Sequence, residues 1–139
     1  MTITFRYKTI TRPDGSQIKT PSIPILLSGK ESIDTIALLD SGADVSAMPL
    51  AIAEILGLDL SGDKSEAYGI GGAVDSIETT VDATLEKGHE KYKLRIAVKV
   101  ILGNFDFPVL LGRADFFDGF IISFHQKNEK VSLKRVSGK

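Results

Sequence analysis

The sequence predicts a mainly β fold, either a closed β-barrel or a β-sandwich, with one or two short helices, from three observations. Apolar and polar residues alternate along most of the chain, which is the period of a half-buried strand. The alternating stretches are short, and turn residues such as glycine, proline and asparagine separate them. Only two short segments have helical composition. Many short strands at turn-rich spacing are typical of barrels and sandwiches, which leave few strand edges open.

The opening strand is predicted from Ile3, Phe5 and Tyr7, which alternate with polar residues and therefore share one face. Residues 12–15, with the sequence Arg-Pro-Asp-Gly, predict a tight turn. Proline pre-sets the first central dihedral of such a turn, and glycine accepts its last position.

The next two strands are expected over residues 23–27 and 33–39, joined at residues 28–30. Pro21 and Pro24 lack the amide hydrogen that a central strand donates to its neighbour. We therefore expect this stretch to lie at a sheet edge or a bend.

A helix is predicted after Pro49, which suits a helix start, over the apolar residues 50–56, with Gly57 closing it. A second short helix is expected over residues 114–118. Turns are expected at residues 87–89 and 126–128. The remaining strands are predicted over residues 64–68, 74–85, 92–100, 107–111, 120–124 and 130–136.

The length of 139 residues fits a single domain spanning residues 1–139, since domains usually contain roughly 100 to 200 residues. A hydrophobic content of 42% is sufficient for one core. The net charge of -1 argues against a nucleic-acid partner, which would favour a basic excess. The basic residues Lys130, Lys134 and Arg135 fit a solvated edge strand.

The absence of cysteine excludes thiol nucleophiles, disulfides and cysteine-ligated zinc, and it fits a reducing compartment. No apolar run approaches the roughly 20 residues of a membrane helix. The first residues alternate instead of forming the continuous apolar stretch of a signal peptide. We therefore expect a cytoplasmic protein without a membrane partner.

The most informative segment for chemistry is residues 37–43, Ala-Leu-Leu-Asp-Ser-Gly-Ala. An apolar strand runs directly into the carboxylate of Asp40, followed by the hydroxyl of Ser41. Gly42 has no side chain to block a close backbone approach. Because Asp-Ser-Gly is also a common turn sequence, the segment alone leaves an ordinary turn and a catalytic loop both open.

Two further segments accompany it. Residues 68–72 contain three glycines in four residues between two β-like stretches, which predicts a hairpin tip. Residues 109–113, Val-Leu-Leu-Gly-Arg, are an apolar strand ending in glycine. In this order and spacing the three segments resemble the retropepsins, the single-domain aspartic proteases of retroviruses and their cellular and bacterial relatives. The resemblance covers roughly residues 33–117, more than half of the chain.

The resemblance implies a retropepsin-like barrel with a flap hairpin, in which Asp40 is the catalytic aspartate. Ser41 takes the position whose hydroxyl contacts its counterpart across a dimer. Asp44 and Arg113 match an ion pair of some relatives; two independent surface charges are the alternative. The implied substrate-binding positions are Ser41, Gly42, Ala43, Asp44, Gly69, Ile70, Gly71 and Gly72, and the supporting positions are Gly112 and Arg113.

The sequence departs from the family pattern in two places. Ser41 replaces the commoner threonine, a substitution also found in active members. Residues 120–136 offer a C-terminal hairpin that viral members lack. Since viral members dimerise through terminal strands, this hairpin leaves the geometry of the dimer open.

A pair of aspartates can hydrolyse a peptide bond without metal or cofactor. Two adjacent carboxylates share one proton, because like charges so close cannot both ionise, and they supply both an acid and a base. The chain has one such motif, so a homodimer must place Asp40 against its own copy. The expected function is an aspartic endopeptidase acting on a peptide or protein. The alternative is a non-catalytic module that binds extended peptides by strand addition.

The sequence does not fit other cofactor-binding or metal-binding motifs. Residues 69–74 nearly match a dinucleotide fingerprint, but a valine occupies the last small position and a strand follows. His89 and His125 lack metal-ligand spacing. Asp59 and Asp63 lack the alternating oxygen ligands of a calcium loop. The sequence therefore predicts no metal site.

Overall fold

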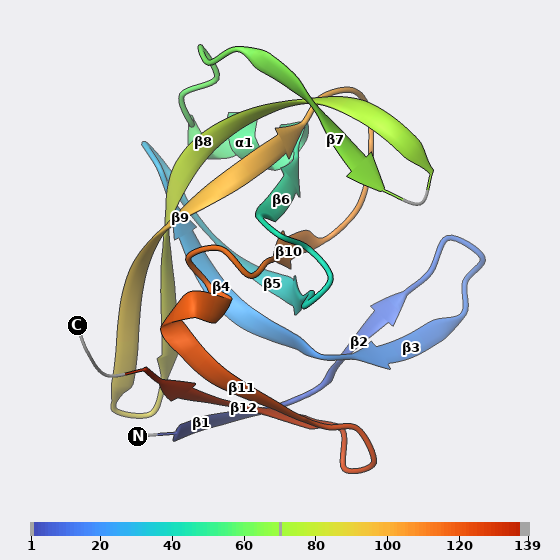
Figure 1. Ribbon diagram of the computed structural model, residues 1–139. Coiled ribbons are helices and arrows are strands. Elements are labelled where there is room, and N and C mark those ends of the chain that lie inside the picture. The colour runs from blue at the N-terminus through green and yellow to red at the C-terminus, as the bar shows by residue number, and fades with distance from the viewer. Residues whose placement is uncertain (1, 70, 137–139) are drawn as a thin grey trace.

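The computed structural model describes residues 2–69 and 71–136, which are mainly β as the sequence predicted (Figure 1). One α-helix, α1 (Leu50–Leu56), and one 3-10 helix, η1 (Phe117–Gly119), accompany the strands. No helix within the described ranges is long and apolar enough to cross a membrane. The strands are β1 (Thr2–Arg6), β2 (Lys8–Thr11), β3 (Gln17–Thr20), β4 (Ser22–Ser28), β5 (Ser32–Leu39), β6 (Ser46–Pro49), β7 (Lys64–Gly69), β8 (Gly72–Lys87), β9 (Glu90–Ile101), β10 (Val109–Leu111), β11 (Phe120–His125) and β12 (Lys130–Arg135).

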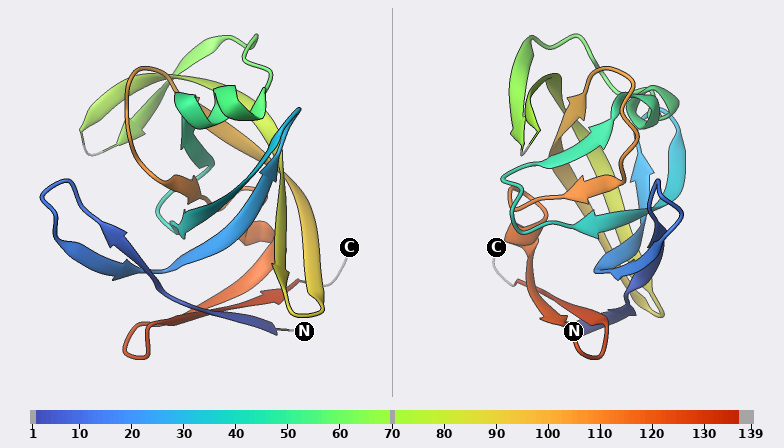
Figure 2. Two further views of the ribbon diagram at one scale, coloured as in Figure 1. Left: turned by 180° about the vertical axis from the view of Figure 1, so that it is seen from behind. Right: turned by 90° about the vertical axis from the view of Figure 1, so that its right-hand side faces the viewer.

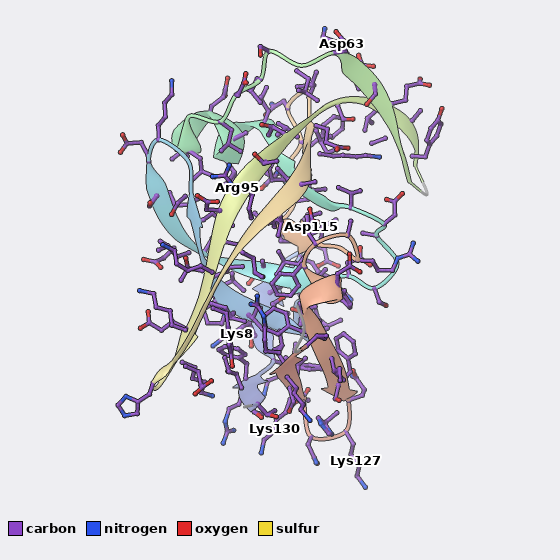
Figure 3. The ribbon with its side chains drawn as sticks, turned by 60° about the vertical axis from the view of Figure 1, so that its left-hand side comes forward. Lys8, Asp63, Arg95, Asp115, Lys127 and Lys130 are labelled. Atoms are coloured by element: carbon purple, nitrogen blue, oxygen red, sulfur yellow. The ribbon has the colours of Figure 1, made fainter. Side chains whose placement is uncertain are left out.

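The main sheet has seven strands in the order β4-β5-β10-β6-β9-β8-β7. An additional pairing joins Leu26–Ser28 of β4 to Asp82–Thr84 of β8, so the sheet curls until its strands meet again. β7 extends beyond this junction as the outer strand of a hairpin. A three-stranded sheet, β1-β12-β11, lies below the main sheet, and β2 and β3 form a separate projecting hairpin (Figures 1 and 2). Lys127 and Lys130 mark the turn of the lower sheet in Figure 3.

The position of β10 determines where the candidate site lies. β10 pairs in parallel with β5 and antiparallel with β6, so it separates two strands that are consecutive in the sequence. The connection between β5 and β6, residues 40–45, must therefore pass over the end of β10. This connection contains Asp40.

One core cluster joins the curled sheet, α1 and the lower sheet. As the alternation predicted, Ile3, Phe5 and Tyr7 are all buried. Phe116 is fully buried, and its ring centroid lies 5.3 Å from that of Phe120. These aromatic contacts attach the segment after β10 to the core.

The predicted turns and the helix are confirmed. The Gly15 amide donates to the Arg12 carbonyl at 2.9 Å, and Gly15 has φ 87°. Gly57 closes α1 with φ 68°, which suits glycine. At Pro24, β4 pairs only with β5, because the pairing with β8 begins at Leu26. The proline therefore lies where no amide hydrogen is required.

Two predictions about the region from residue 107 to residue 118 were inaccurate. The strand predicted over 107–111 is reduced to β10, Val109–Leu111, since Pro108 has no amide hydrogen to extend the ladder. The helix predicted over 114–118 is replaced by turns that lead into η1. Asp115 has φ 68°, which is incompatible with a continuous right-handed helix.

Candidate active site

Asp40 is the first residue after β5, and its side chain is half-buried. The Asp40 amide donates to the Leu111 carbonyl at 3.0 Å, and the Ala43 amide donates to the Asp40 carbonyl at 3.1 Å. The Gly42 amide donates to the Asp40 carboxylate oxygen Oδ1 at 3.0 Å. A donor to a carboxylate forms a charge-assisted hydrogen bond. The turn therefore orients the carboxylate of its own first residue.

Gly42 and Ser41 form the exposed tip of this turn. A Cβ atom at Gly42 would lie 3.2 Å from Asp40 Oδ1, which is a tight contact. Glycine at this position therefore allows the backbone amide to approach the carboxylate. Within the chain, the group that the Gly42 backbone approaches closely is the Asp40 carboxylate.

The residues that follow β10 bind residues 43 and 44 of the loop through backbone hydrogen bonds. The Arg113 amide donates to the Ala43 carbonyl at 2.9 Å, and the Ala114 amide donates to the Asp44 carbonyl at 2.9 Å. The Gly112 amide donates to the hydroxyl of buried Ser46 at 3.0 Å. The structure thus brings together two segments that lie far apart in the sequence, since Arg113 follows Ala43 by 70 residues.

Position 112 requires glycine because neighbouring backbone atoms leave no room for a Cβ atom, and not because of its backbone angles. A Cβ atom there would lie 2.5 Å from the carbonyl carbon of Val45 and 2.7 Å from its oxygen. Both are backbone atoms, so no side-chain rotation could relieve the contact. This close packing explains why glycine follows the apolar strand.

An apolar floor lies beside Asp40. Leu38 is two residues before Asp40 on β5 and therefore shares its face. Leu110 pairs with both Leu38 and Ala47, and all three side chains are only half-buried. Sequence analysis missed these residues as site candidates. The available signal was the position of Leu38 two residues before the carboxylate.

The hairpin β7–β8 contains the predicted glycine-rich tip. Gly69 pairs with Gly72, whose φ is 109°, and nothing lies within 4 Å of a Cβ built at Gly69, Gly71 or Gly72. The hairpin projects from the top of the main sheet on the side of the loop after β5 (Figures 1 and 2). Tyr68, next to the tip, is 79% exposed. The predicted substrate-binding residue Ile70 lies outside the described residues.

The structure favours two separate charges at Asp44 and Arg113. Both residues are exposed, and the ion pairs in residues 2–69 and 71–136 are Lys19–Glu129 and Arg95–Asp82. Backbone hydrogen bonds from residues 113 and 114 already connect the two segments. The expected ion pair is therefore not needed to hold the loop.

Asp115 is a further residue that sequence analysis missed, and its role is structural. Its carboxylate oxygen Oδ2 accepts a hydrogen bond from the Ala97 amide of β9 at 2.7 Å. Its own amide donates to Asp118 at 3.1 Å. Figure 3 shows Asp115 close to β9. Asp115 therefore attaches the segment that supports the loop to the main sheet.

Other polar features lie outside the loop. Hydrogen bonds from Ser16 and Ser61 lower the pKa values of Asp14 and Asp59, which are both exposed. Within the part of the chain that the structure describes, no cluster of three or more histidine, cysteine or acidic residues could hold a metal ion. A hollow of about 590 Å³ lies between β4 and the β8–β9 turn. Half of its twelve lining residues are charged, and none of them belongs to residues 40–45.

No protein-family model and no curated protein matches the sequence. Among solved structures, the chain is similar to a retropepsin-like aspartic protease from Rickettsia conorii. The sequence identity is 19%, the match covers 96% of this chain and 90% of that chain, and the TM-score is 0.59. It is also similar to EIAV protease complexed with an inhibitor, at 27% identity, 68% and 83% coverage, and a TM-score of 0.46. The first match shows that the chain has the retropepsin-like fold, as its motifs predicted.

Replacement of Gly112 by alanine should destabilise the protein by about 1–3 kcal/mol, the usual range for overpacking. The new Cβ atom would meet the Val45 backbone, so the loop that carries Asp40 must move. Urea denaturation measures the change. Gly62→Ala is the matched control, since its Cβ would make only ordinary contacts of 3.5 Å or more. Equal stability of the two variants would contradict the packing argument.

Proposed function

We propose that the protein is an aspartic endopeptidase whose catalytic pair is Asp40 and the Asp40 of a second copy. The observation that carries the proposal is the placement of Asp40 at the end of an apolar strand of a retropepsin-like fold, with the Gly42 amide bonded to its carboxylate. The half-buried floor of Leu38, Leu110 and Ala47 gives an apolar surface beside it.

The proposed reaction uses the two carboxylates in different protonation states. The ionised carboxylate removes a proton from a water molecule, and the oxygen of that water attacks the peptide carbonyl carbon. The protonated carboxylate donates its proton to the peptide nitrogen, and the C–N bond breaks to release the amine and the new carboxylic acid. Like charges at close range keep one proton between the pair, so the pair provides both acid and base.

The homodimer follows from the single motif. An isologous interface about a twofold axis places identical residues opposite one another, and the loop tip at Ser41 and Gly42 is exposed and free to meet its copy. In the proposed dimer, Ser41 contacts the partner loop. The backbones of Gly42, Ala43 and Asp44 bind the substrate strand, and the hairpin tip of Gly69, Ile70, Gly71 and Gly72 closes over it as a flap.

A non-catalytic peptide-binding module is the second candidate, and β7 favours it. β7 is the last strand of the seven-stranded sheet, so one of its edges has no strand partner within the described residues. An unpaired edge can accept an extended peptide as a further strand. Such binding requires no carboxylate at position 40, which is why the enzyme is preferred.

Asp40→Asn should abolish peptide cleavage while leaving the fold intact, because asparagine is nearly isosteric but cannot exchange the proton. A peptide-library assay from acidic to neutral pH measures cleavage, and circular dichroism checks folding. Asp63→Asn, at an exposed position before β7, is the control and should retain activity. A variant at Asp40 that kept more than a few per cent of the rate would exclude this residue as the catalyst. Peptide binding without cleavage by the wild type would favour the second candidate.

Mixing wild type with excess Asp40→Asn should suppress the activity of the wild-type chains. At a 1:1 ratio, random exchange leaves about half of the wild-type chains in active dimers. Activity per chain should also fall on dilution below the dimer dissociation constant. Sedimentation at the same concentrations measures assembly. A fully active monomer, or a variant that dimerises without inhibiting, would refute the shared pair.

Gly72→Ala should lower catalytic efficiency with a small loss of stability. Gly72 has φ 109°, and a side chain there strains the hairpin tip by about 1 kcal/mol or more. A flap must open and close for each polypeptide, so a distorted tip slows turnover. Gly88→Ala is the matched control, because Gly88 has φ 62° in the β8–β9 turn and equally open surroundings. Equal efficiency of the two variants would exclude the flap role.

A further inference from the structure

A second hollow, of about 590 Å³, lies at the base of the projecting hairpin β2–β3. It is bounded by β2 and the turn after it, by β5, and by the segment that leads into β10. Its apolar walls are Ile10, Pro13, Ile36, Phe107 and Pro108. Half of its ten lining residues are therefore apolar, in contrast to the charged hollow beside the β8–β9 turn.

Ile36, which lines this hollow, lies on the strand face that leads to the candidate active site. Ile36, Leu38 and Asp40 alternate along β5 and share one face. Ile36 is 39% exposed and Leu38 is half-buried, so the described residues cover this apolar face only in part. Val109 pairs with Ala37, which brings the preceding Pro108 beside Ile36. An apolar strip thus leads from the hollow to the carboxylate.

The separation along this strip matches a short length of peptide. Four residues of strand separate Ile36 from Asp40, which corresponds to about 13 Å. An extended polypeptide covers that distance with about four residues. A substrate centred on Asp40 can therefore reach the hollow without leaving the extended conformation that a protease groove binds.

The hairpin β2–β3 forms one wall of the hollow. Its strands pair only with each other, and it projects on the same side as the β7–β8 hairpin (Figures 1 and 2). At its base, Thr20 donates to the Lys8 carbonyl at 3.3 Å, and Lys19 pairs with Glu129 at 3.4 Å. A two-stranded hairpin is marginal alone, so this base holds it in place.

The charges at the hollow favour an acidic ligand. Lys8 and Arg12 line it against one carboxylate, that of Asp106, which leaves an excess of one positive charge in a chain of net charge -1. An acidic side chain next to an apolar one would therefore be attracted to this surface.

We infer that this hollow is a substrate subsite that takes a large apolar side chain with an acidic neighbour, about four residues from the cleaved bond. The inference rests on the proposed peptidase function. Because a twofold axis duplicates the hollow, an extended substrate meets one copy on each side of the bond. The selectivity should therefore occur at similar distances on both sides.

The test compares short peptides, with three residues on each side of the bond, with long peptides of six residues on each side. In the long peptides the outer positions carry leucine-glutamate or leucine-lysine. Wild type should prefer glutamate by about fivefold in kcat/KM, expressed mainly in KM. The double variant Lys8→Glu/Arg12→Glu should reverse this preference. Ile36→Thr should lower the ratio of long-peptide to short-peptide kcat/KM by about tenfold.

Ile55→Thr is the matched control, because Ile55 is a 55% exposed isoleucine on α1 outside the hollow. It should keep the wild-type ratio. Equal cleavage of short and long peptides by wild type and Ile36→Thr would overturn the subsite and leave the peptidase standing. If Ile36→Thr changed the dimer dissociation constant but not the selectivity, the hollow would be a contact with the second copy. That result would also overturn the subsite. No cleavage of any peptide by wild type would overturn both proposals.

Discussion

The packing of Gly112 against the backbone of Val45 and Ser46 is the contact on which the candidate site depends. β10 lies between β5 and β6, so their connection must cross over its end. The crossing is close enough that a Cβ atom at Gly112 would lie 2.5 Å from Val45. Three amides, from residues 112 to 114, then bond to the crossing loop. Asp40 is held because this crossing leaves its loop few alternative positions.

The same topology gives the site its two chemical surfaces. The parallel pairing of β10 with β5 aligns Leu110 with Leu38, and both lie on the face that ends at Asp40. The other face, with Leu39 and Leu111, is buried in the core. A carboxylate thus emerges at the border between an apolar floor and an exposed turn. Asp115, bonded to β9, attaches the supporting segment to the opposite part of the sheet. Packing and chemistry therefore depend on the same few strands.

Local patterns predicted most strands, the turn at Gly15, the helix α1 and the three motif segments. Each of these is encoded by alternation or turn chemistry within a few residues. The floor of Leu38, Leu110 and Ala47 could not be predicted, because it depends on the register of β10 between β5 and β6, which are distant from β10 in the sequence. The 3-10 turn after Asp115 was missed because a tertiary hydrogen bond to Ala97 fixes a conformation that helix propensity opposes. Asp44 and Arg113 form no ion pair within the described residues, and backbone hydrogen bonds connect their two segments.

The described part of one chain offers only half of the proposed catalytic pair, and some of its exposed large apolar residues lie on surfaces that the proposal uses. Tyr68 is exposed beside the β7–β8 tip, Ile36 lies four residues before Asp40, and Ile121 and Phe124 lie on the edge strand of the lower sheet. None of these side chains belongs to the buried core cluster. Exposed apolar side chains that gather around a functional surface indicate a surface that a ligand or partner covers. A substrate strand between the floor and the hairpin would cover the first two, and the lower sheet remains available for contact between copies. In the proposed enzyme, the two projecting hairpins would contact the substrate, whereas the placement of Asp40 depends on the crossing of residues 40–45 over the end of β10.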